Sequence, residues 1–475
     1  MIRASLTTLL SLGCTSESGL TGLRLEPNAR VPTAVVATWE SNGHEGETFV
    51  EYGLTEGALD RRTPAGTEAE ATALALTAGR TWFVRAVTVD ELGERWESGT
   101  ASVDVAAPPT ALPGFTINDR DDAAIDASAL IFVTLIEDNG SWIVGLNRDG
   151  EAAWWYESEG QISIPSIHPA ANGQGLMFTH HSEQEGKPKA GLLRMSFDGV
   201  EQALTVGDGH HDVAQLPDGR IAWIRNENPT GVVLEGGATA DLSVDTLVEN
   251  DEGAPEEDAE VRFSFLDDYP HTPWDTCSHF SEEGQGGGAD YTHANSVMYD
   301  PDRDALLVMT KNLDALTAVD RSTGSVLWQA GGRYGDLLDV DGDVVGNGPQ
   351  AWQVDGPNHT WWSHSHMSHF WGDGFLVFDN GYHHAVMSSR VVEYAIDPEA
   401  HTLQKVWEFP SETGVFNPLL GDARRLPNGN TLVSWTISGM LTEITPVGEV
   451  VWRAEVDLGS ATGRLVYVPD IYHVE

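Results

Sequence analysis

Three histidines in this chain each precede a near-copy of one short repeat. His211 precedes Asp-Val-Ala-Gln-Leu-Pro-Asp-Gly, His293 precedes Ala-Asn-Ser-Val-Met-Tyr-Asp-Pro-Asp, and His366 precedes Met-Ser-His-Phe-Trp-Gly-Asp-Gly. Because repeats place equivalent positions at equivalent points of a fold, we expect the three imidazoles to lie close together. Imidazole can act near neutral pH as a nucleophile, a proton donor or acceptor, or a metal ligand. The three histidines are therefore the candidate functional site.

A fourth copy of the repeat tests whether its geometry alone requires histidine. Residues 422–429 match residues 212–219 in spacing and chemistry, but Gly421 precedes them. A residue required by turn geometry should recur in every copy, whereas a residue required by a site occurs only in the copies that build it. The pattern favours a functional role for the histidines, with His210 as the alternative to His211 if the register shifts by one.

The elements that position these histidines are predicted to be β-strands. The chain has 475 residues, of which 40% are hydrophobic, with 50 glycines and 16 tryptophans. This hydrophobic content is normal for a globular core. Short apolar runs such as residues 129–136 and 375–378 are typical of strands. We expect a mostly β protein.

The N-terminal part is predicted to be a separate small domain. Residues 20–107 alternate apolar and polar side chains in short segments separated by Gly, Pro and Asn turns, which predicts a β-sandwich. Leu76, Gly79, Thr81, Trp82 and Arg85 resemble the end of a fibronectin type III domain, a sandwich that would serve as a spacer. Residues 108–114 are the expected linker.

Two recurring patterns over residues 115–475 predict a β-propeller. Gly-x-x-x-Trp occurs at residues 150–154, 324–328 and 448–452, and the Pro-Asp-Gly type repeats begin near residues 165, 212, 295, 366 and 421. Such small β-meanders cannot bury their own faces and must stack, here radially. With residues 115–157, closed by residues 465–469, the count is six blades, although five or seven are also compatible. The acidic, glycine-rich residues 228–290 are expected to leave their blade as an insertion.

The net charge limits the classes of partner that we expect, and the N-terminal residues predict the cellular compartment. With 73 acidic against 26 basic residues, the formal net charge of -47 repels polyanions and excludes nucleic acid as the expected partner. Residues 1–14 have a basic start, a short apolar run and an end in Leu-Gly-Cys, which predicts a signal peptide with lipidation of Cys14. Only Cys277 then remains, so no intrachain disulfide is expected. We expect an extracytoplasmic protein in the periplasm or cell envelope, held to the membrane only through that anchor.

Several motifs together resemble the bacterial arylsulfate sulfotransferase family. They are Gly-His-His-Asp-Val at 209–213, Tyr-Thr-His-Ala-Asn-Ser-Val at 291–297, and the segments 319–328, 378–381, 389–394 and 426–433, and the resemblance covers roughly residues 130–475. It implies a six-bladed propeller preceded by a small β domain. It also implies transfer of a sulfuryl group from an aryl sulfate donor to a phenolic acceptor, through a sulfated histidine and with no nucleotide cofactor or metal.

Carried over position by position, the resemblance assigns roles to single residues. His366 matches the sulfated histidine, and His211 and His293 match its two partners. Lys311 stands where the family has its catalytic arginine, which is a departure, because arginine offers a planar fork and lysine only a point charge. The expected substrate-binding residues are Arg333, Arg390, Trp371 and Asn295, of which the two arginines are candidate substitutes for the missing guanidinium.

The chemistry of the residues supports the same reading. A neutral imidazole is a competent nucleophile that divides a difficult transfer into two easier steps, with ping-pong kinetics as the consequence. The leaving aryl oxygen needs a proton, which His293 or His211 could supply. The sulfuryl oxygens gather negative charge, so a cation is needed in a protein this acidic.

The sequence is also compatible with other functions. One is a non-catalytic propeller that binds aromatic or sulfated ligands or a protein partner. Another is a zinc hydrolase that uses His364, His366 and His369, whose His-x-His-x-x-His spacing resembles a metal motif. Residues 339–343 resemble the acidic part of a calcium loop, but the twelfth position is Gln350, which favours a solvated turn. The sequence names neither the physiological donor and acceptor nor the oligomeric state.

Overall fold

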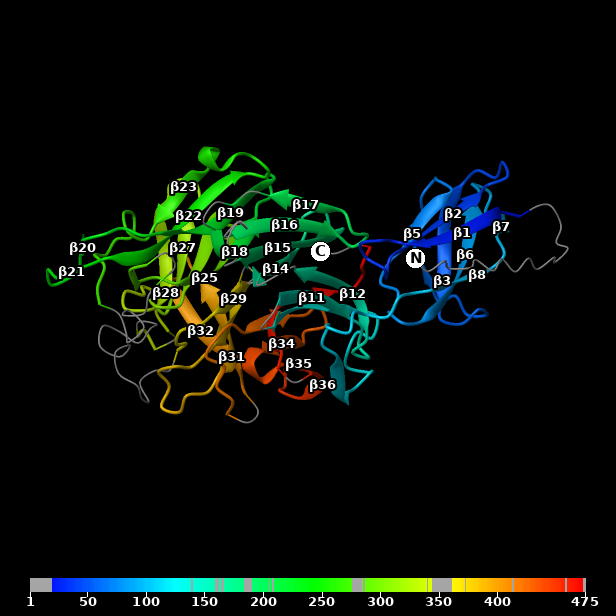
Figure 1. Ribbon diagram of the computed structural model, residues 1–475. Coiled ribbons are helices and arrows are strands. Elements are labelled where there is room, and N and C mark those ends of the chain that lie inside the picture. Colours follow the sequence, from blue (N-terminus) through cyan, green and yellow to red (C-terminus); the bar gives the residue numbers. More distant parts are fainter. Residues whose placement is uncertain are drawn as a thin grey trace, which may run out of the picture. The chain divides into compact units, whose positions relative to one another are not determined.

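The computed structural model describes residues 19–475 apart from 138–139, 159–161, 164–165, 183–189, 205, 207–208, 276–283, 285–286, 340, 344–360, 372, 412–413, 458 and 473–475 (Figure 1). The chain divides into two compact units, Met1–Ala107 and Pro108–Glu475. Cys14 and Cys277, on which the predictions of lipidation and of an absent disulfide depend, lie outside the described residues.

The first unit consists of two antiparallel sheets. One has the order β1–β2–β5 and the other the order β4–β3–β6–β7, with β8 also paired to β6. The strands are β1 (Thr21–Pro27), β2 (Val35–Glu40), β3 (Glu47–Gly53), β4 (Arg61–Arg62), β5 (Glu70–Ala73), β6 (Thr81–Val89), β7 (Arg95–Glu97) and β8 (Ala101–Asp104). Along β6 the buried side chains of Trp82, Val84 and Ala86 alternate with less buried ones, as expected for a strand with one face on a core.

The second unit contains six antiparallel sheets of four or five strands in its described residues. The first has β10 (Leu130–Glu137), β11 (Gly140–Leu146), β12 (Ala152–Ser158) and β37 (Ala461–Val468). The second has β13 (Ile162–Ser163), β14 (Ile167–Pro169), β15 (Gly175–Ser182), β16 (Ala190–Ser196) and β17 (Glu201–Leu204). The third has β18 (Gly209–Gln215), β19 (Arg220–Glu227), β22 (Leu242–Asp251), β23 (Glu260–Ser264) and, parallel to β22, the short β24 (Ala289–Asp290).

The remaining three sheets follow the same plan. The fourth has β25 (Ala294–Asp300), β26 (Ala305–Thr310), β27 (Ala315–Asp320) and β28 (Val326–Gly331). The fifth has β29 (Met367–Phe370), β30 (Gly374–Asp379), β31 (Arg390–Asp397) and β32 (Thr402–Pro410). The sixth has β33 (Asp422–Arg425), β34 (Thr431–Trp435), β35 (Met440–Ile444), β36 (Val450–Val456) and β9 (Phe115–Arg120). The described residues also contain a small ribbon of β20 (Val232–Val233) and β21 (Thr239–Ala240) and two 3-10 turns, Glu256–Asp258 and Thr436–Ser438.

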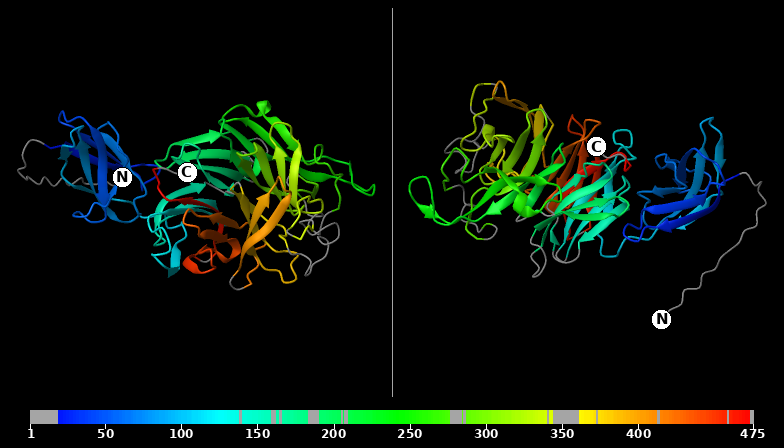
Figure 2. Two further views of the ribbon diagram at one scale, coloured as in Figure 1. Left: turned by 180° about the vertical axis from the view of Figure 1, so that it is seen from behind. Right: turned by 90° about the horizontal axis from the view of Figure 1, so that it is seen from above.

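The innermost strands of these sheets form a closed ring. Contacts lead from β37 to β14, from the second sheet to β18, and then through β25, β29 and β33 back to β37, and Figures 1 and 2 show the sheets of this unit arranged around one axis. The ring is locked at both ends of the unit, because the C-terminal β37 pairs with β10 and the early β9 pairs with β36. The prediction of an all-β propeller is confirmed.

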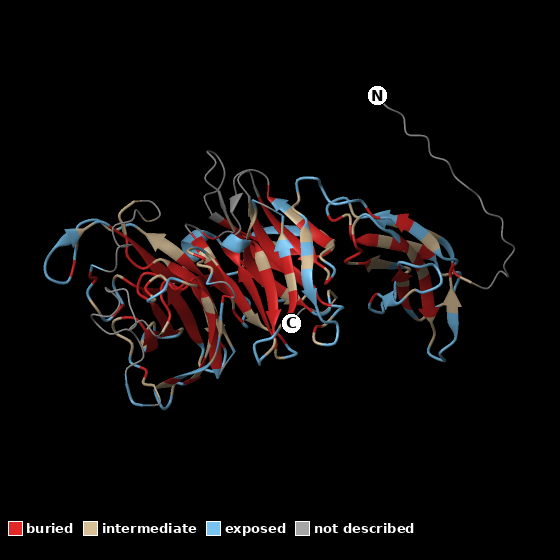
Figure 3. Ribbon diagram, turned by 90° about the horizontal axis from the view of Figure 1, so that it is seen from below, coloured by how far each residue is buried: buried red, intermediate tan, exposed pale blue. Residues whose placement is uncertain are grey.

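The sheets bury both faces against their neighbours (Figure 3). Every residue of β26 and β30, the second strands of their sheets, is buried, and apart from the terminal Thr310 and Asp379 these strands are apolar runs. Two of the three tryptophans in the recurring Gly-x-x-x-Trp pattern form hydrogen bonds to the next sheet. The indole N–H of Trp154 donates to the carbonyl of Phe197 at 3.3 Å, and that of Trp452 donates to the carbonyl of Arg148 at 3.0 Å.

The acidic stretch 228–290 differs from the prediction. It was expected to leave its blade, but β22 and β23 within it are the third and fourth strands of the third sheet. The acidic side chains misled the prediction: Glu249 of β22 is fully buried and paired with Arg220, Arg262 and Arg321. A buried carboxylate surrounded by guanidinium groups is compatible with a sheet interior.

Among the described residues no helix has the length and apolarity that crossing a bilayer requires.

Candidate active site

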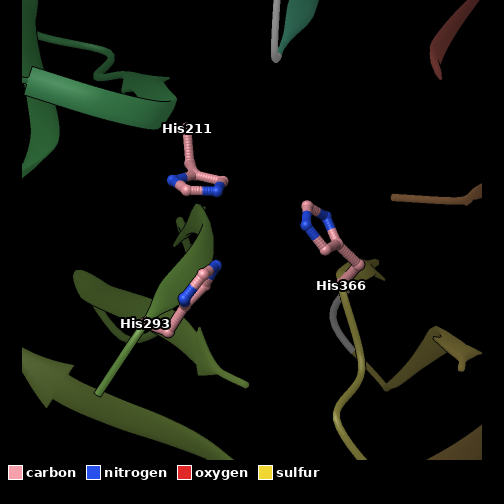
Figure 4. Close-up of side chains that lie close together, drawn as sticks. All are labelled: His211, His293 and His366. Atoms are coloured by element: carbon pink, nitrogen blue, oxygen red, sulfur yellow. The ribbon is translucent and has the colours of Figure 1, made fainter. Parts of the chain in front are cut away.

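The three predicted histidines come together at one end of the ring. His211 lies near the start of β18, and His293 and His366 directly precede β25 and β29, the inner strands of the next two sheets. The ring centroid of His211 lies 5.2 Å from that of His293 and 5.6 Å from that of His366. Each imidazole offers a nitrogen within 4.8 Å of the other two, and Figure 4 shows the three rings around one common space.

The backbone at these positions is strained. His211 and His293 have φ values of 56° and 48°, in the left-handed region that residues other than glycine seldom adopt. Bulges interrupt the strand pairing directly beside them, between His210 and Val213 in β18 and between Ala294 and Ser296 in β25. The bulges turn the side chains toward the axis, and such strain is concentrated at functional sites.

The fourth repeat has glycine for a packing reason. Gly421 has a φ of 102°, and a Cβ atom built there would lie 2.2 Å from the ring of Phe378. Histidine could not occupy this position without displacing a core side chain. The absence of histidine from the fourth repeat is therefore weaker evidence for a functional role of the other three histidines than the comparison of the four repeats implied.

A buried relay fixes the orientation of His211. Asp245 Oδ1 lies 2.8 Å from His210 Nε2, and His210 Nδ1 lies 2.6 Å from His211 Nδ1. The carboxylate can only accept, so a neutral His210 donates from Nε2 and accepts at Nδ1 the proton of His211 Nδ1. This arrangement leaves a lone pair on His211 Nε2. Burial and the neighbouring histidines His210 and His293 hold the pKa of His211 well below its usual range, so the ring is neutral.

His293 has a carboxylate of its own. Its Nδ1 lies 2.5 Å from Asp290 Oδ2, and the side chain is 27% exposed. A carboxylate at Nδ1 fixes the tautomer and stabilises the imidazolium form, which is the arrangement used by acid and base histidines in hydrolases. Of the three rings, His293 is the one with a carboxylate at a ring nitrogen within the described residues.

His366 is the most buried of the three, with 5% of its surface exposed. Burial, and after it the charges of Arg464 and of protonated His293 and Lys311, hold its pKa well below the usual range. Its Nδ1 is buried and has no hydrogen-bond partner among the described residues. The ring is thus a neutral imidazole whose Nε2 is the nitrogen available to react.

Lys311 supplies positive charge at the site. It follows the end of β26, its backbone N–H donates to the carbonyl of His293 at 3.0 Å, and its side chain is buried. Three residues later Asp314 accepts the backbone N–H of His364 at 2.5 Å. Burial raises the pKa of Asp314 to about 7, with the nearby Asp379 adding to the shift. Lys311 therefore lies beside a carboxyl group that is partly protonated at neutral pH.

Comparison with known proteins agrees with this geometry. The family model of arylsulfotransferases (ASST) matches residues 117–461, which is well over half of the chain. The chain belongs to the arylsulfotransferase family. Membership supports sulfuryl transfer from aryl sulfates as its chemistry and places the three histidines, Lys311 and Asn295 within the matched region.

Solved structures are similar only at a distance. A protein of unknown function from Bacteroides caccae is 15% identical with a TM-score of 0.42, covering 72% of this chain and 100% of its own. Two proteins from Bacteroides thetaiotaomicron, one of unknown function and one quinonprotein alcohol dehydrogenase-like, are each 10% identical with TM-scores of 0.34 and 0.35. Each covers 92% of this chain, and 98% and 94% of its own. No curated protein matches the chain.

The candidate site also contains a guanidinium that sequence reasoning missed. Arg464 of β37 is 2% exposed and donates to the backbone carbonyls of Asn295, at 2.7 Å, and of His366, at 3.4 Å. It comes from the last strand of the chain, and no motif marks it. Its charge helps to keep His366 neutral. Asp245 and Asp290, the partners of the histidines, were also missed, although Asp290 lies only three residues before His293.

Asn295 braces the site. Its amide nitrogen donates to the carbonyl of Ser365 at 3.2 Å, which ties the bulge of β25 to the segment carrying His366. The side-chain oxygen is buried and has no partner within the described part of the chain. As an acceptor, this oxygen could bind a phenol hydroxyl but not the oxygens of a sulfate.

The other three expected substrate-binding residues lie in different surroundings. Arg333 pairs with Glu235 at 2.8 Å and lies over the rings of Trp274 and Tyr334. Arg390 binds the buried Asp379 at 2.8 Å and also Glu408. Trp371 is 38% exposed and packs edge-on against His369, beyond the far end of β29. None of the three has a described contact with His211, His293 or His366.

The histidines of the His-x-His-x-x-His motif do not form one site. His364 Nε2 lies 2.7 Å from His383 Nε2, His366 joins His211 and His293, and His369 is on the far side of the ring. The spacing that resembled a metal motif is therefore coincidental. The cluster of His211, His293 and His366 could itself hold a metal ion, because three imidazoles are a common zinc ligand set. In the segment that resembles part of a calcium loop, Asp339 Oδ1 accepts the backbone N–H groups of Asp341 and Asp343, each at 2.9 Å.

Proposed function

We propose that this arylsulfotransferase moves a sulfuryl group from an aryl sulfate to a phenol through a sulfated His366. The observation that carries the proposal is a buried, neutral imidazole with two further imidazoles in contact range and two buried cations nearby. A neutral imidazole has the lone pair that attacks sulfur, which a protonated ring lacks, and it can later leave from sulfur as the neutral ring. Two half-reactions follow, with ping-pong kinetics.

In the first half-reaction, the lone pair of His366 Nε2 forms a bond to sulfur while the bond from sulfur to the aryl oxygen breaks. The aryl oxygen leaves with that electron pair and needs a proton. We assign the proton to the imidazolium of His293, because Asp290 lies 2.5 Å from its Nδ1 and stabilises the charged ring. His211 stays neutral throughout, because its partner is another imidazole and not a carboxylate.

In the second half-reaction, the phenol oxygen bonds to sulfur and the bond from sulfur to nitrogen breaks, with its electron pair returning to His366. His293 takes the phenol proton and regains its starting state. Lys311 stabilises the sulfuryl oxygens, on which charge accumulates in both transition states. Lysine supplies the charge of the family arginine without its two-pronged geometry.

Mass spectrometry tests the proposal directly. The purified protein is exposed briefly to 4-nitrophenyl sulfate, and nitrophenol release is followed in parallel. We expect a sulfuryl adduct on His366 that added phenol discharges, and no adduct in His366→Ala. His364→Ala is the matched control, since His364 is equally buried two residues away but bonds to His383. A folded protein that gives neither adduct nor nitrophenol would contradict the proposal and favour a binding propeller.

The three-histidine cluster favours one competing function, a metal-dependent hydrolase. Its three nitrogens lie within 4.8 Å of one another, and zinc bound by three histidines activates water. Metal analysis of purified protein separates the two functions. Stoichiometric zinc, with loss of sulfate release on chelation, would replace the proposed transfer mechanism by hydrolysis.

Two further proposals concern the rest of the chain. Residues 20–107 are proposed to be a fibronectin type III-like spacer, supported by their two sheets with the orders β1–β2–β5 and β4–β3–β6–β7. Lipidation of Cys14 and location in the cell envelope are proposed from the leader sequence alone. Fractionation of cells expressing Cys14→Ser should move the protein from the membrane fraction to the soluble fraction.

A further inference from the structure

A cavity opens at the other end of the ring from the histidines. It has a volume of about 470 Å³ and is lined by five inner strands or the residues beside them, β14, β18, β25, β29 and β33. Its walls begin at Asp212 and Met367, one residue after His211 and His366, and extend to Gln215 and Phe370. At about 3.3 Å per residue, the far walls lie some 13 Å beyond the histidines.

A buried layer separates the cavity from the histidine cluster. Ser296, Ser368, Asn295 and Arg464 are all 2% exposed or less. The hydroxyls of Ser296 and Ser368, on the neighbouring strands β25 and β29, lie 3.2 Å apart, and Arg464 donates to the carbonyl of Asn295. A ligand in this cavity would therefore not touch the reacting nitrogen of His366.

One wall of the cavity offers positive charge and an unused ring nitrogen. Arg424 is partly exposed there, and its one hydrogen bond in the described part of the chain joins Nε to Asp422 at 3.3 Å. The terminal nitrogens of the guanidinium remain available. His369 Nδ1 is buried without a partner among the described side chains and backbone. Burial, together with the charge of Arg424, lowers the pKa of His369 to about 3, so this ring is a neutral donor or acceptor.

The carboxylate in the cavity wall is already engaged. Asp212 Oδ1 lies 2.6 Å from His168 Nε2, and Asp212 Oδ2 accepts the backbone N–H of Val297 at 3.1 Å. Both oxygens are thus occupied by protein donors. The rest of the wall is largely apolar, formed by Pro169, Val213, Val297, Met298, Met367 and Phe370.

We infer that this cavity is a second ligand site, which binds a small aromatic monoanion with its ring on the apolar wall and its charge on Arg424. The volume is in the range of small-molecule sites, which combine apolar walls with a few placed polar groups. In a chain with a formal net charge of -47, an anion requires such a local cation. The inference does not depend on sulfuryl transfer, because the cavity lies beyond the buried layer.

Calorimetric titration of the full-length protein with 2-naphthoate tests the inference. This probe carries neither a sulfate to donate nor a hydroxyl to accept one. We expect saturable binding to wild type, about tenfold weaker binding of the neutral naphthalene-2-methanol, and about tenfold weaker naphthoate binding in Arg424→Gln, the size of one charge-assisted hydrogen bond. Arg425→Gln is the matched control, because its guanidinium is in the same strand but pairs with Glu393.

The variant His366→Ala tests whether naphthoate binds in this cavity and not at the histidine cluster. His366→Ala should bind naphthoate as wild type does, and Arg424→Lys should recover part of the lost affinity. The inference is overturned if naphthoate does not bind, if Arg424→Gln and Arg425→Gln bind equally, or if binding disappears in His366→Ala. If Arg424→Gln does not fold, the comparison of the charged and neutral probes on wild type still decides whether the cavity selects an anion.

Discussion

Replacing Asp290 by asparagine should slow sulfuryl transfer without changing the fold. The substitution keeps the shape of the side chain and removes the negative charge that lies 2.5 Å from His293 Nδ1. The transition state in which His293 is charged then loses its counter-charge. The neutral amide can also turn its N–H toward the ring and favour the wrong tautomer.

The magnitude follows from the geometry of the pair. Two unit charges about 4 Å apart interact by about 4 kcal/mol at an effective dielectric constant of about 20. The side chains are 27% and 10% exposed, and solvent screening reduces the interaction to about 2–3 kcal/mol. At about 1.4 kcal/mol per factor of ten, Asp290→Asn should lower kcat/KM by about 100-fold.

The assay compares two donors with one acceptor. Phenyl sulfate has a poor leaving group that needs the proton from His293, whereas 4-nitrophenyl sulfate has a good one that needs it less. The loss in Asp290→Asn should therefore be close to 100-fold with phenyl sulfate and much smaller with 4-nitrophenyl sulfate, on the scale just derived. Asp300→Asn is the control, since Asp300 is buried at the other end of β25 and pairs with Arg303. An equal loss with both donors would refute the role of His293 as the general acid.

Three further predictions concern charge and stability. Lys311→Met should lower kcat/KM by about 100-fold and Lys311→Arg should keep most of the activity, whereas Lys405→Met, an exposed control, should have no effect; equal rates for all three variants would remove Lys311 from the mechanism. The pKa of Asp314 is raised from 3.8 to about 7, so the folded state binds the extra proton and loses stability as pH rises through this window. Asp314→Asn should therefore raise the Tm at pH 8 more than at pH 4, and equal changes at both pH values would contradict this. Arg148 and Glu443 form a fully buried ion pair between the first and sixth sheets, so Arg148→Met should lower the free energy of unfolding in urea by about 3–5 kcal/mol. The double variant Arg148→Met/Glu443→Leu should recover much of that loss. If the single and the double variant were equally stable, an unpaired buried Glu443 carboxylate would not be the cause of the loss.

The sequence determined the class of fold because repetition and alternation are local properties. The Gly-x-x-x-Trp pattern and the Pro-Asp-Gly type repeats recur with the sheets, and the inner strands begin close to the predicted positions, as β18 and β33 illustrate. The sequence also predicted that His211, His293 and His366 lie close together, because equivalent positions in a propeller converge on its axis. Acidic composition was a poor guide, since β22 is part of a sheet in spite of its carboxylates.

Only the tertiary structure shows which groups form hydrogen bonds with those histidines or lie beside them. Arg464 reaches the site from the last strand of the chain, and Asp245 reaches His210 from the third strand of a sheet. Such contacts join residues far apart in sequence, so no local pattern encodes them. Packing decided the fourth repeat as well, because Phe378 leaves no room for a side chain at Gly421. The sequence alone therefore predicts which residue types can carry out the chemistry. Their protonation and orientation depend on burial and on partner residues, which come together only in the closed ring.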